Sequence, residues 1–382
     1  MSHLSERAER TPPSGIRRFF EIAEETDDVI SLGVGEPDFS APWPARKAAI
    51  DALERGQTSY TANRGRRDLR EAIASHATRY GHEYDPDEEV LVTTGVSEGM
   101  DLAMRALVDP GDVVAVVEPA YISYGPDATF SGGSVLPVPT AASDQFRLTR
   151  DALERAGAEE ADLLVYCYPN NPTGAVMSQA DYEEVAAFAR EHDLFVLADE
   201  VYAALSYDGG HATVATEPGM RERTVVFDGF SKAYAMTGLR LGYAMGPAPV
   251  IDAMNRIHQY TMLSAPTTAQ AAAIEALESC DDAVAEMCRQ YDRRRRFVLS
   301  RFREMGLDCF EAKGAFYVFP AVPGDDEAFA EGLLREAGVA VVPGRVFGDG
   351  GEGHVRVSYA RSLSELREAT DRIESFLAEW RA

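Results

Sequence analysis

Lysine is nearly absent from this chain of 382 residues. Only three of its 37 basic residues are lysines, and the other 34 are arginines. An arginine cannot form an imine with an aldehyde, because its guanidinium stays protonated at any working pH. A lysine can, once its surroundings lower its pKa enough to expose the free amine. The lysine that stands out is Lys232, which follows Ser231 directly after an apolar run typical of a buried strand.

Basic charge and long apolar runs are also scarce. Acidic residues outnumber basic ones by 63 to 37, giving a net charge of −26. This balance argues against binding to nucleic acid or to an anionic membrane surface. No apolar run approaches the ~20 residues of a membrane span, and the first residues are too polar for a secretory signal. Because salt screens self-repulsion, the acid excess favours a halophile-like protein in a salt-rich cytoplasm.

Cysteines and histidines are few and form no known metal or disulfide pattern. The four cysteines contain no CxxC pair, and the seven histidines contain no HExxH spacing. We therefore expect reduced thiols, as in a cytoplasm, and no bound metal.

Short apolar segments alternate with helical patterns between about residues 46 and 246. The alternation predicts an α/β fold, in which helices cover both faces of a mostly parallel central sheet. Ligands bind such sheets outside the carboxyl ends of the strands. The predicted strands are 89–93, 113–117, 163–167, 194–198, 224–227 and 241–245, and the predicted helices include 97–107 and 178–192.

The pattern changes after residue 290. A long charged helix over 291–305 is followed by a strand-like segment at 314–319. A helix at 327–337, a strand at 354–359 and a terminal helix complete the chain. We predict a large domain over 41–290 and a smaller α/β domain formed by 1–40 and 291–382.

Polar residues follow four of the predicted strands. Gly95, Val96 and Ser97 stand at the start of a helix, where backbone N–H groups bind phosphate, although a serine cap alone would explain the serine. Asn171 lies in the Pro-Asn-Asn-Pro-Thr-Gly turn at 169–174, which holds its side chain rigidly.

The other two segments carry charge. Asp199, three residues before Tyr202, ends a buried strand, where a carboxylate is costly unless it meets a cation. Ser231 and Arg240 flank Lys232 and together could hold a phosphate by charge-assisted hydrogen bonds. Taken singly, a salt bridge or a turn would explain each segment, but four in one series of strands and helices favour a cofactor site.

Nearly the whole chain resembles the class I/II aminotransferases of fold type I, of the aspartate aminotransferase kind, which depend on pyridoxal 5′-phosphate. The Pro-Asn-Asn-Pro-Thr-Gly and Ser-Lys-x-Tyr-x-Met-x-Gly-x-Arg segments, in this order, are the most specific part of the likeness. Further matching segments are 13–17, 32–39, 60–65, 259–266, 314–317 and 356–360.

The resemblance implies a role for each candidate residue. Lys232 would attach the cofactor through an imine and later move the proton at the substrate Cα. Asp199 would pair with the protonated pyridine nitrogen, while Tyr202 and Asn171 would hydrogen-bond the ring oxygen. The remaining roles are stacking on the ring (Tyr121), phosphate binding (Gly95, Val96, Ser97, Ser231, Arg240 and, from the neighbouring subunit, Tyr60) and substrate carboxylate binding (Arg356 with Asn171 and the backbone near Gly35).

The resemblance also implies a homodimer and a reaction. The expected activity is transfer of the α-amino group of an L-amino acid to a 2-oxo acid by a ping-pong cycle, with glutamate and 2-oxoglutarate as the shared pair and aspartate/aromatic/alanine-type specificity. The alternatives are another enzyme of this fold, such as a β-lyase, a decarboxylase or an acyl-CoA-dependent synthase, or a non-catalytic binding module. The substrate side chain stays open: Arg17, Arg18, Arg64 and Arg361 could bind a second carboxylate, and Ile16, Tyr260 and Phe316 could line an apolar pocket.

Overall fold

A seven-stranded sheet forms the centre of the computed structural model, which describes residues 3–13, 15 and 28–380. Its strands are β2 (Val90–Thr93), β3 (Val113–Glu118), β4 (Ser134–Pro139), β5 (Leu163–Cys167), β6 (Phe195–Asp199), β7 (Thr224–Gly229) and β8 (Gly242–Met245). Their order is β2-β8-β7-β6-β5-β3-β4, and β8 runs antiparallel to both of its neighbours while the other neighbouring pairs are parallel. The predicted α/β fold with a mostly parallel sheet is confirmed.

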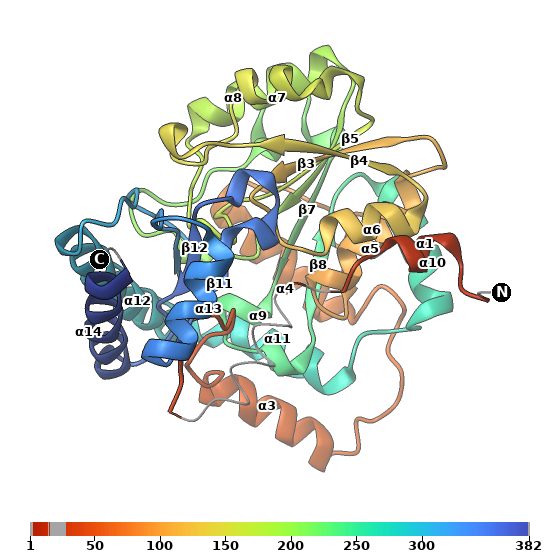
Figure 1. The fold of residues 1–382 in the computed structure, drawn as a ribbon. Coiled ribbons are helices and arrows are strands. Elements are labelled where there is room, and N and C mark those ends of the chain that lie inside the picture. Colours follow the sequence, from red (N-terminus) through yellow and green to blue (C-terminus); the bar gives the residue numbers. More distant parts are fainter. Residues whose placement is uncertain (1–2, 14, 16–27, 381–382) are drawn as a thin grey trace.

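Helices cover both faces of this sheet (Figure 1). The α-helices are α1 (Glu6–Arg10), α3 (Trp43–Glu54), α4 (Arg67–Ala77), α5 (Val96–Leu107), α6 (Tyr124–Ser131), α7 (Arg150–Ala156), α8 (Gln179–Glu191), α9 (Phe230–Ala233), α10 (Ala248–Thr261), α11 (Thr267–Ser279), α12 (Asp281–Glu304), α13 (Asp326–Ala337) and α14 (Leu363–Trp380). In β5, Val165 and Cys167 pack with residues of α5 and α6, whereas Leu164 and Tyr166 pack with residues of α7 and α8. Burial on both faces explains why the strand is apolar at every position.

The predicted strands differ from the observed ones by one or two residues at their ends. β6 and β7 extend far enough to include Asp199 and Gly229. The edge strand β4 was not predicted, because most of its residues are exposed and it contains two prolines instead of an apolar run. The serine cap predicted for α8 is confirmed: Ser178 Oγ accepts from the N–H of Asp181, whose carboxylate accepts from the N–H of Ser178.

The long charged helix begins ten residues earlier than predicted. α12 starts at Asp281, and Asp281 and Asp282 lie in its first turn, where negative charge favours the helix N-terminus. The sequence prediction placed the start at Tyr291 because the charged pattern is densest from there onward.

Two small sheets lie apart from the central one. β1 (Ile30–Ser31) pairs in parallel with β10 (Val339–Ala340). β9 (Tyr317–Val318), β11 (Val342–Pro343) and β12 (Val355–Ser358) form an antiparallel sheet in the order β11-β12-β9. In Figure 1 β11 and β12 lie beside α13, in blue. The division into domains at residues 40 and 290 stays a prediction. Within the described ranges, no helix combines the length and the apolar character needed to cross a membrane.

Candidate active site

A cavity of about 740 Å³ opens beyond the carboxyl ends of the parallel strands. Eleven of the thirteen predicted site residues line it: Gly35, Val96, Ser97, Tyr121, Asn171, Asp199, Tyr202, Ser231, Lys232, Arg240 and Arg356. A larger hollow of about 980 Å³ lies along α14 and contains none of them. The segments singled out in the sequence therefore meet in one place, although they are far apart along the chain.

Lys232 lies in the short helix α9, directly after β7. Its Nζ donates to the carbonyl oxygen of Gly35 across 2.8 Å and lies 5.8 Å from the ring centroid of Tyr202. Burial lowers the pKa of Lys232 to about 8, an effect that the nearby charge of Glu36 partly opposes. About a tenth of the amine is therefore free at pH 7, and a free amine is what a nucleophilic lysine requires.

Asp199 ends β6 and is buried in the cavity wall. Its Oδ2 accepts from the hydroxyl of Tyr124 across 2.6 Å, and its Oδ1 accepts from the N–H of Val201 across 3.1 Å. Burial raises the pKa of Asp199 to about 6, and these two donors oppose the rise. A cation placed opposite the carboxylate would stabilise its ionised form further.

The start of α5 and Arg240 lie side by side in an arrangement suited to an anion. Gly95 precedes α5 with φ of +80°, and a Cβ at this position would lie 2.8 Å from Nη2 of Arg240. Glycine is therefore required both by the backbone conformation and by the close approach of the guanidinium. Val96 and Ser97 form the first turn, where N–H groups point outward and the helix dipole favours negative charge.

Arg356 lies on β12 at the other side of the cavity and is buried. Its Nη1 donates to Oδ1 of Asn171 across 2.8 Å, and its Nη2 donates to the carbonyl oxygen of Gly33 across 2.6 Å. The guanidinium lies 4.7 Å from the ring centroid of Tyr317 and 4.9 Å from that of Phe347. A guanidinium fixed in this way suits a planar carboxylate ligand.

Comparison with known proteins agrees with this geometry. Residues 27–373 match the family of class I and II aminotransferases. This chain belongs to that family. The aminotransferase is 43% identical to an aspartate aminotransferase of Pyrococcus abyssi and 42% identical to an aromatic-amino-acid aminotransferase of Thermococcus litoralis, in each case over 98% of both chains. It also matches the structure of an aspartate aminotransferase of Thermus thermophilus with maleate, at a TM-score of 0.93 and 38% identity over 98% of this chain and 100% of that one.

Enzymes of this family depend on pyridoxal 5′-phosphate, which takes up the amino group and accepts electrons from the substrate Cα. The residues of the aminotransferase fit this cofactor. Lys232 offers a buried amine, Asp199 offers a buried carboxylate, and Arg240 beside the start of α5 offers a guanidinium suited to an anion. The fold type I assignment is likewise supported by the structural match.

Two predicted positions lie outside the cavity lining. Gly95 stands at its edge, beside Arg240. Tyr60 has 79% of its surface exposed and does not line the cavity of its own chain. Two of the arginines considered for a second substrate carboxylate, Arg64 and Arg361, do not line the cavity. Arg64 pairs with Asp252, and Arg361 donates to the carbonyl oxygen of Ser31.

The other residues considered for the substrate side chain differ in position. Phe316 is fully buried, and Lys232 Nζ lies 5.9 Å from its ring centroid. Tyr260 is 88% exposed. Ile16, Arg17 and Arg18 lie outside the described residues.

Several residues near the site were not predicted from the sequence. Tyr124 bonds Asp199, and the hydroxyl of Tyr317 lies 3.0 Å from that of Tyr202. Tyr124 follows Tyr121 by three residues, a helical spacing that would have placed both on the same side of the chain. No sequence signal connects Tyr317 with Tyr202, because their contact depends on how β9 packs against the end of β6.

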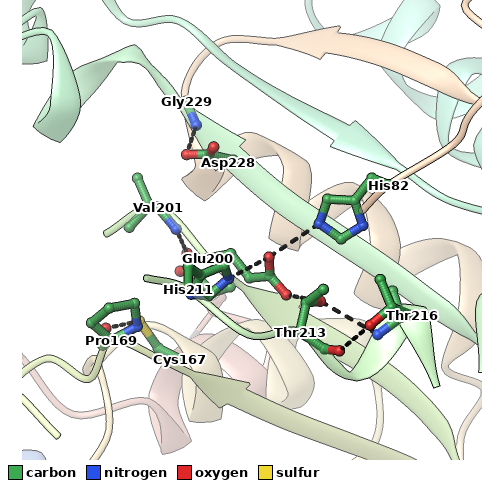
Figure 2. A network of polar contacts seen from close by, with 12 residues as sticks. His82, Cys167, Pro169, Glu200, Val201, His211, Thr213, Thr216, Asp228 and Gly229 are labelled. Atoms are coloured by element: carbon green, nitrogen blue, oxygen red, sulfur yellow. Dashed lines mark hydrogen bonds and ion pairs between the residues drawn. The ribbon is translucent and has the colours of Figure 1, made fainter. Parts of the chain in front are cut away.

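Glu200, the residue after Asp199, forms a second polar network (Figure 2). Its Oε2 lies 2.8 Å from Nε2 of His211 and 3.3 Å from Nε2 of His82, and its Oε1 accepts from the hydroxyl of Thr213. Burial opposes ionisation of this carboxyl, yet His211 and His82 stabilise the charge and lower the pKa of Glu200 to about 2. Among the described residues, no group of three His, Cys, Asp or Glu could hold a metal ion.

Proposed function

We propose that this aminotransferase moves the α-amino group of an L-amino acid to a 2-oxo acid in a ping-pong cycle, with glutamate and 2-oxoglutarate as the shared pair. One observation carries the proposal: a buried lysine amine, a buried carboxylate and a fixed guanidinium line the same cavity of about 740 Å³. These groups match what amino-group transfer needs, namely a proton carrier, a partner for a cationic ring and a carboxylate clamp.

Lys232 is the proposed point of cofactor attachment and the group that moves the proton at the substrate Cα. Its pKa of about 8 suits both tasks, because the amine exists in free and protonated forms near neutral pH. Asp199 would hold the pyridine nitrogen in its protonated form, and Tyr202 and Asn171 would donate to the ring oxygen. Tyr121 would stack on the ring.

Phosphate binding is assigned to Gly95, Val96, Ser97, Ser231 and Arg240. Arg356 would bind the substrate α-carboxylate, with Asn171 and the backbone near Gly35 beside it. The close packing around Gly35 supports its place beside the substrate carboxylate, since a Cβ at Gly35 would lie 2.8 Å from the hydroxyl of Tyr317. A bidentate clamp at this point orients the Cα–H bond toward Lys232.

The substrate side chain is proposed to be of the aspartate, aromatic or alanine type. The names of the relatives support the first two classes. Among the described residues that line the cavity, the cations are Lys232, Arg240 and Arg356, and each already has a proposed role. Binding of a second carboxylate would therefore require a cation from outside this set.

A homodimer with shared active sites is the proposed working unit. The segment of Tyr60 is tied to the segment after α10, because Asn63 donates to the carbonyl oxygen of Leu263 across 2.7 Å. Tyr60, Tyr260 and Met262 in these segments are exposed, which supports a contact with a second copy of the chain. Tyr60 would then reach the phosphate in the neighbouring cavity.

We also propose that the enzyme acts in a reducing, salt-rich cytoplasm. The four cysteines are free thiols, which supports a reducing cytoplasm. The net charge of −26 supports adaptation to high salt.

The decisive experiment is the absorption spectrum of the purified protein in high salt, before and after glutamate is added, with Lys232→Ala as the control. We expect a yellow form that glutamate bleaches, and no such form in Lys232→Ala. A yellow form that no amino acid bleaches would point to another reaction of this fold. Absence of the yellow form after addition of cofactor would contradict the role of Lys232.

A further inference from the structure

Tyr124 is a buried tyrosine that none of the roles above uses. It is the first residue of α6, is 2% exposed and lines the cavity. Its hydroxyl donates to Oδ2 of Asp199 across 2.6 Å, over a sequence separation of 75 residues. Short hydrogen bonds to a charged acceptor are stronger than those between neutral groups.

The surroundings of Asp199 make this donor important. Among the described residues, the carboxylate accepts two hydrogen bonds, one from Tyr124 and one from the N–H of Val201. The other titratable groups that face it are Cys167 from β5, Lys232 from α9 and Glu200, the next residue. Lys232 is the cation of this set, and attachment to the cofactor would remove its charge from the amine.

Burial favours the neutral acid at Asp199, and the two donors favour the carboxylate. The N–H of Val201 belongs to the backbone of the same turn and stays in any side-chain variant. The hydroxyl of Tyr124 is therefore the donor that a substitution can remove, and its loss would shift Asp199 toward the neutral acid. It also fixes Oδ2 in direction, because α6 and β6 are both anchored in the core.

We propose that Tyr124 is a positioning residue of this aminotransferase, whose hydroxyl keeps Asp199 ionised and oriented toward a protonated ring nitrogen of the cofactor. The proposal rests on the proposed role of Asp199. Without the hydroxyl, Asp199 would take the proton from the ring nitrogen more readily, and the ring would lose its positive charge.

The variant Tyr124→Phe tests this inference, and Tyr166→Phe is its matched control. Tyr166 is also fully buried, on the neighbouring strand β5, and its hydroxyl has no hydrogen-bond partner among the described residues. Both variants remove one buried hydroxyl and keep the ring. Thermal unfolding of the two, compared with the unaltered enzyme, reports any general loss of packing.

The main measurement is ¹⁵N NMR of enzymes loaded with ring-¹⁵N-labelled pyridoxal 5′-phosphate, followed over pH. We expect the ring nitrogen of Tyr124→Phe to lose its proton at lower pH than in the unaltered enzyme and in Tyr166→Phe. We also expect its dissociation constant for the cofactor to rise about tenfold, the typical effect of losing one hydrogen bond to a charged group.

Asp199→Asn separates this inference from the role on which it rests. If Asp199→Asn leaves the ring nitrogen protonated, the proposed role of Asp199 is wrong and the inference falls with it. If Asp199→Asn removes the proton but Tyr124→Phe behaves like the unaltered enzyme, Tyr124 has no such role and the function of Asp199 stands. Equal changes in Tyr124→Phe and Tyr166→Phe would indicate loss of packing and would also overturn the inference.

Discussion

Arg356 and Asn171 are 185 residues apart in the sequence, yet Nη1 of the arginine donates to Oδ1 of the asparagine across 2.8 Å. The bond joins the small antiparallel sheet to the turn that follows β5 of the central sheet. The rings of Tyr317 and Phe347 and two hydrogen bonds hold the guanidinium in place before any ligand arrives. Such preorganisation reduces the entropy lost on binding a carboxylate.

This geometry makes Arg356→Lys a severe change despite conserved charge. A lysine cannot reach Asn171 and Gly33 together and cannot stack on an aromatic ring as a plane. We expect kcat/KM for amino acids to fall roughly 30- to 100-fold, equal to about 2–3 kcal/mol, while the protein stays folded. Arg361→Lys, which alters an arginine outside the cavity lining, should leave kcat/KM nearly unchanged. Equal losses in both variants would contradict the clamp.

Gly95→Ala should weaken cofactor binding through a steric contact with Arg240. The added Cβ would lie 2.8 Å from Nη2, so the guanidinium must move away from the start of α5. Gly157→Ala is the matched control, since Gly157 has a similar φ of +75° but no atom within 4 Å of the place that an added methyl group would take. Gly157→Ala should lose about 1 kcal/mol of folding stability from its left-handed backbone. Gly95→Ala should lose more, about 1–3 kcal/mol, because φ of +80° with ψ of 164° is a conformation that only glycine adopts readily. We expect Gly95→Ala alone to raise the dissociation constant of pyridoxal 5′-phosphate, by at least about tenfold, measured by equilibrium dialysis.

The rate of cofactor attachment should follow the ionisation of Lys232. Burial lowers the pKa of its amine to about 8, so the reactive free amine increases as the pH rises through 8 and then levels off. Glu36→Gln removes the charge that favours the protonated amine and should shift this profile to lower pH. Stopped-flow absorbance after mixing cofactor-free protein with pyridoxal 5′-phosphate measures the rate. A profile that still climbs near pH 10 would show that burial does not lower the pKa of the amine. A profile that Glu36→Gln leaves in place would show that the charge of Glu36 does not affect it.

Eleven residues of the cavity lining could be named from the sequence. Asn171, Asp199 and Lys232 each follow an apolar segment, and parallel strands bring their carboxyl ends to one edge of the sheet. Strand periodicity and turn residues are local signals, so these positions could be read from short stretches of the chain.

Contacts between distant segments could not be read in the same way. The Tyr124–Asp199 bond depends on how α6 packs beside β6, and the pairing of Glu200 with His82 depends on two loops meeting behind the sheet. The edge strand β4 was missed for a related reason, since its partner β3 and not its own apolar content determines its pairing. Where a residue acts through contact with a distant helix or strand, the sequence around it gives little sign of that contact.

Glu200 supports a final prediction, on stability and pH. Its folded-state pKa of about 2 lies below the ordinary value of 4.5, so its stabilising effect is fully present above pH 4.5 and is lost as the pH falls toward 2. The difference corresponds to roughly 3 kcal/mol. Glu200→Gln should therefore be clearly less stable than the unaltered protein in urea at pH 7, and the gap should narrow between pH 4.5 and the lowest pH at which the protein folds. Glu191→Gln is the control, because Glu191 pairs with Arg150 at the exposed surface and its loss should have no measurable effect. A gap for Glu200→Gln that stays constant with pH would show that packing, and not the charge held by His82 and His211, accounts for the contribution of Glu200.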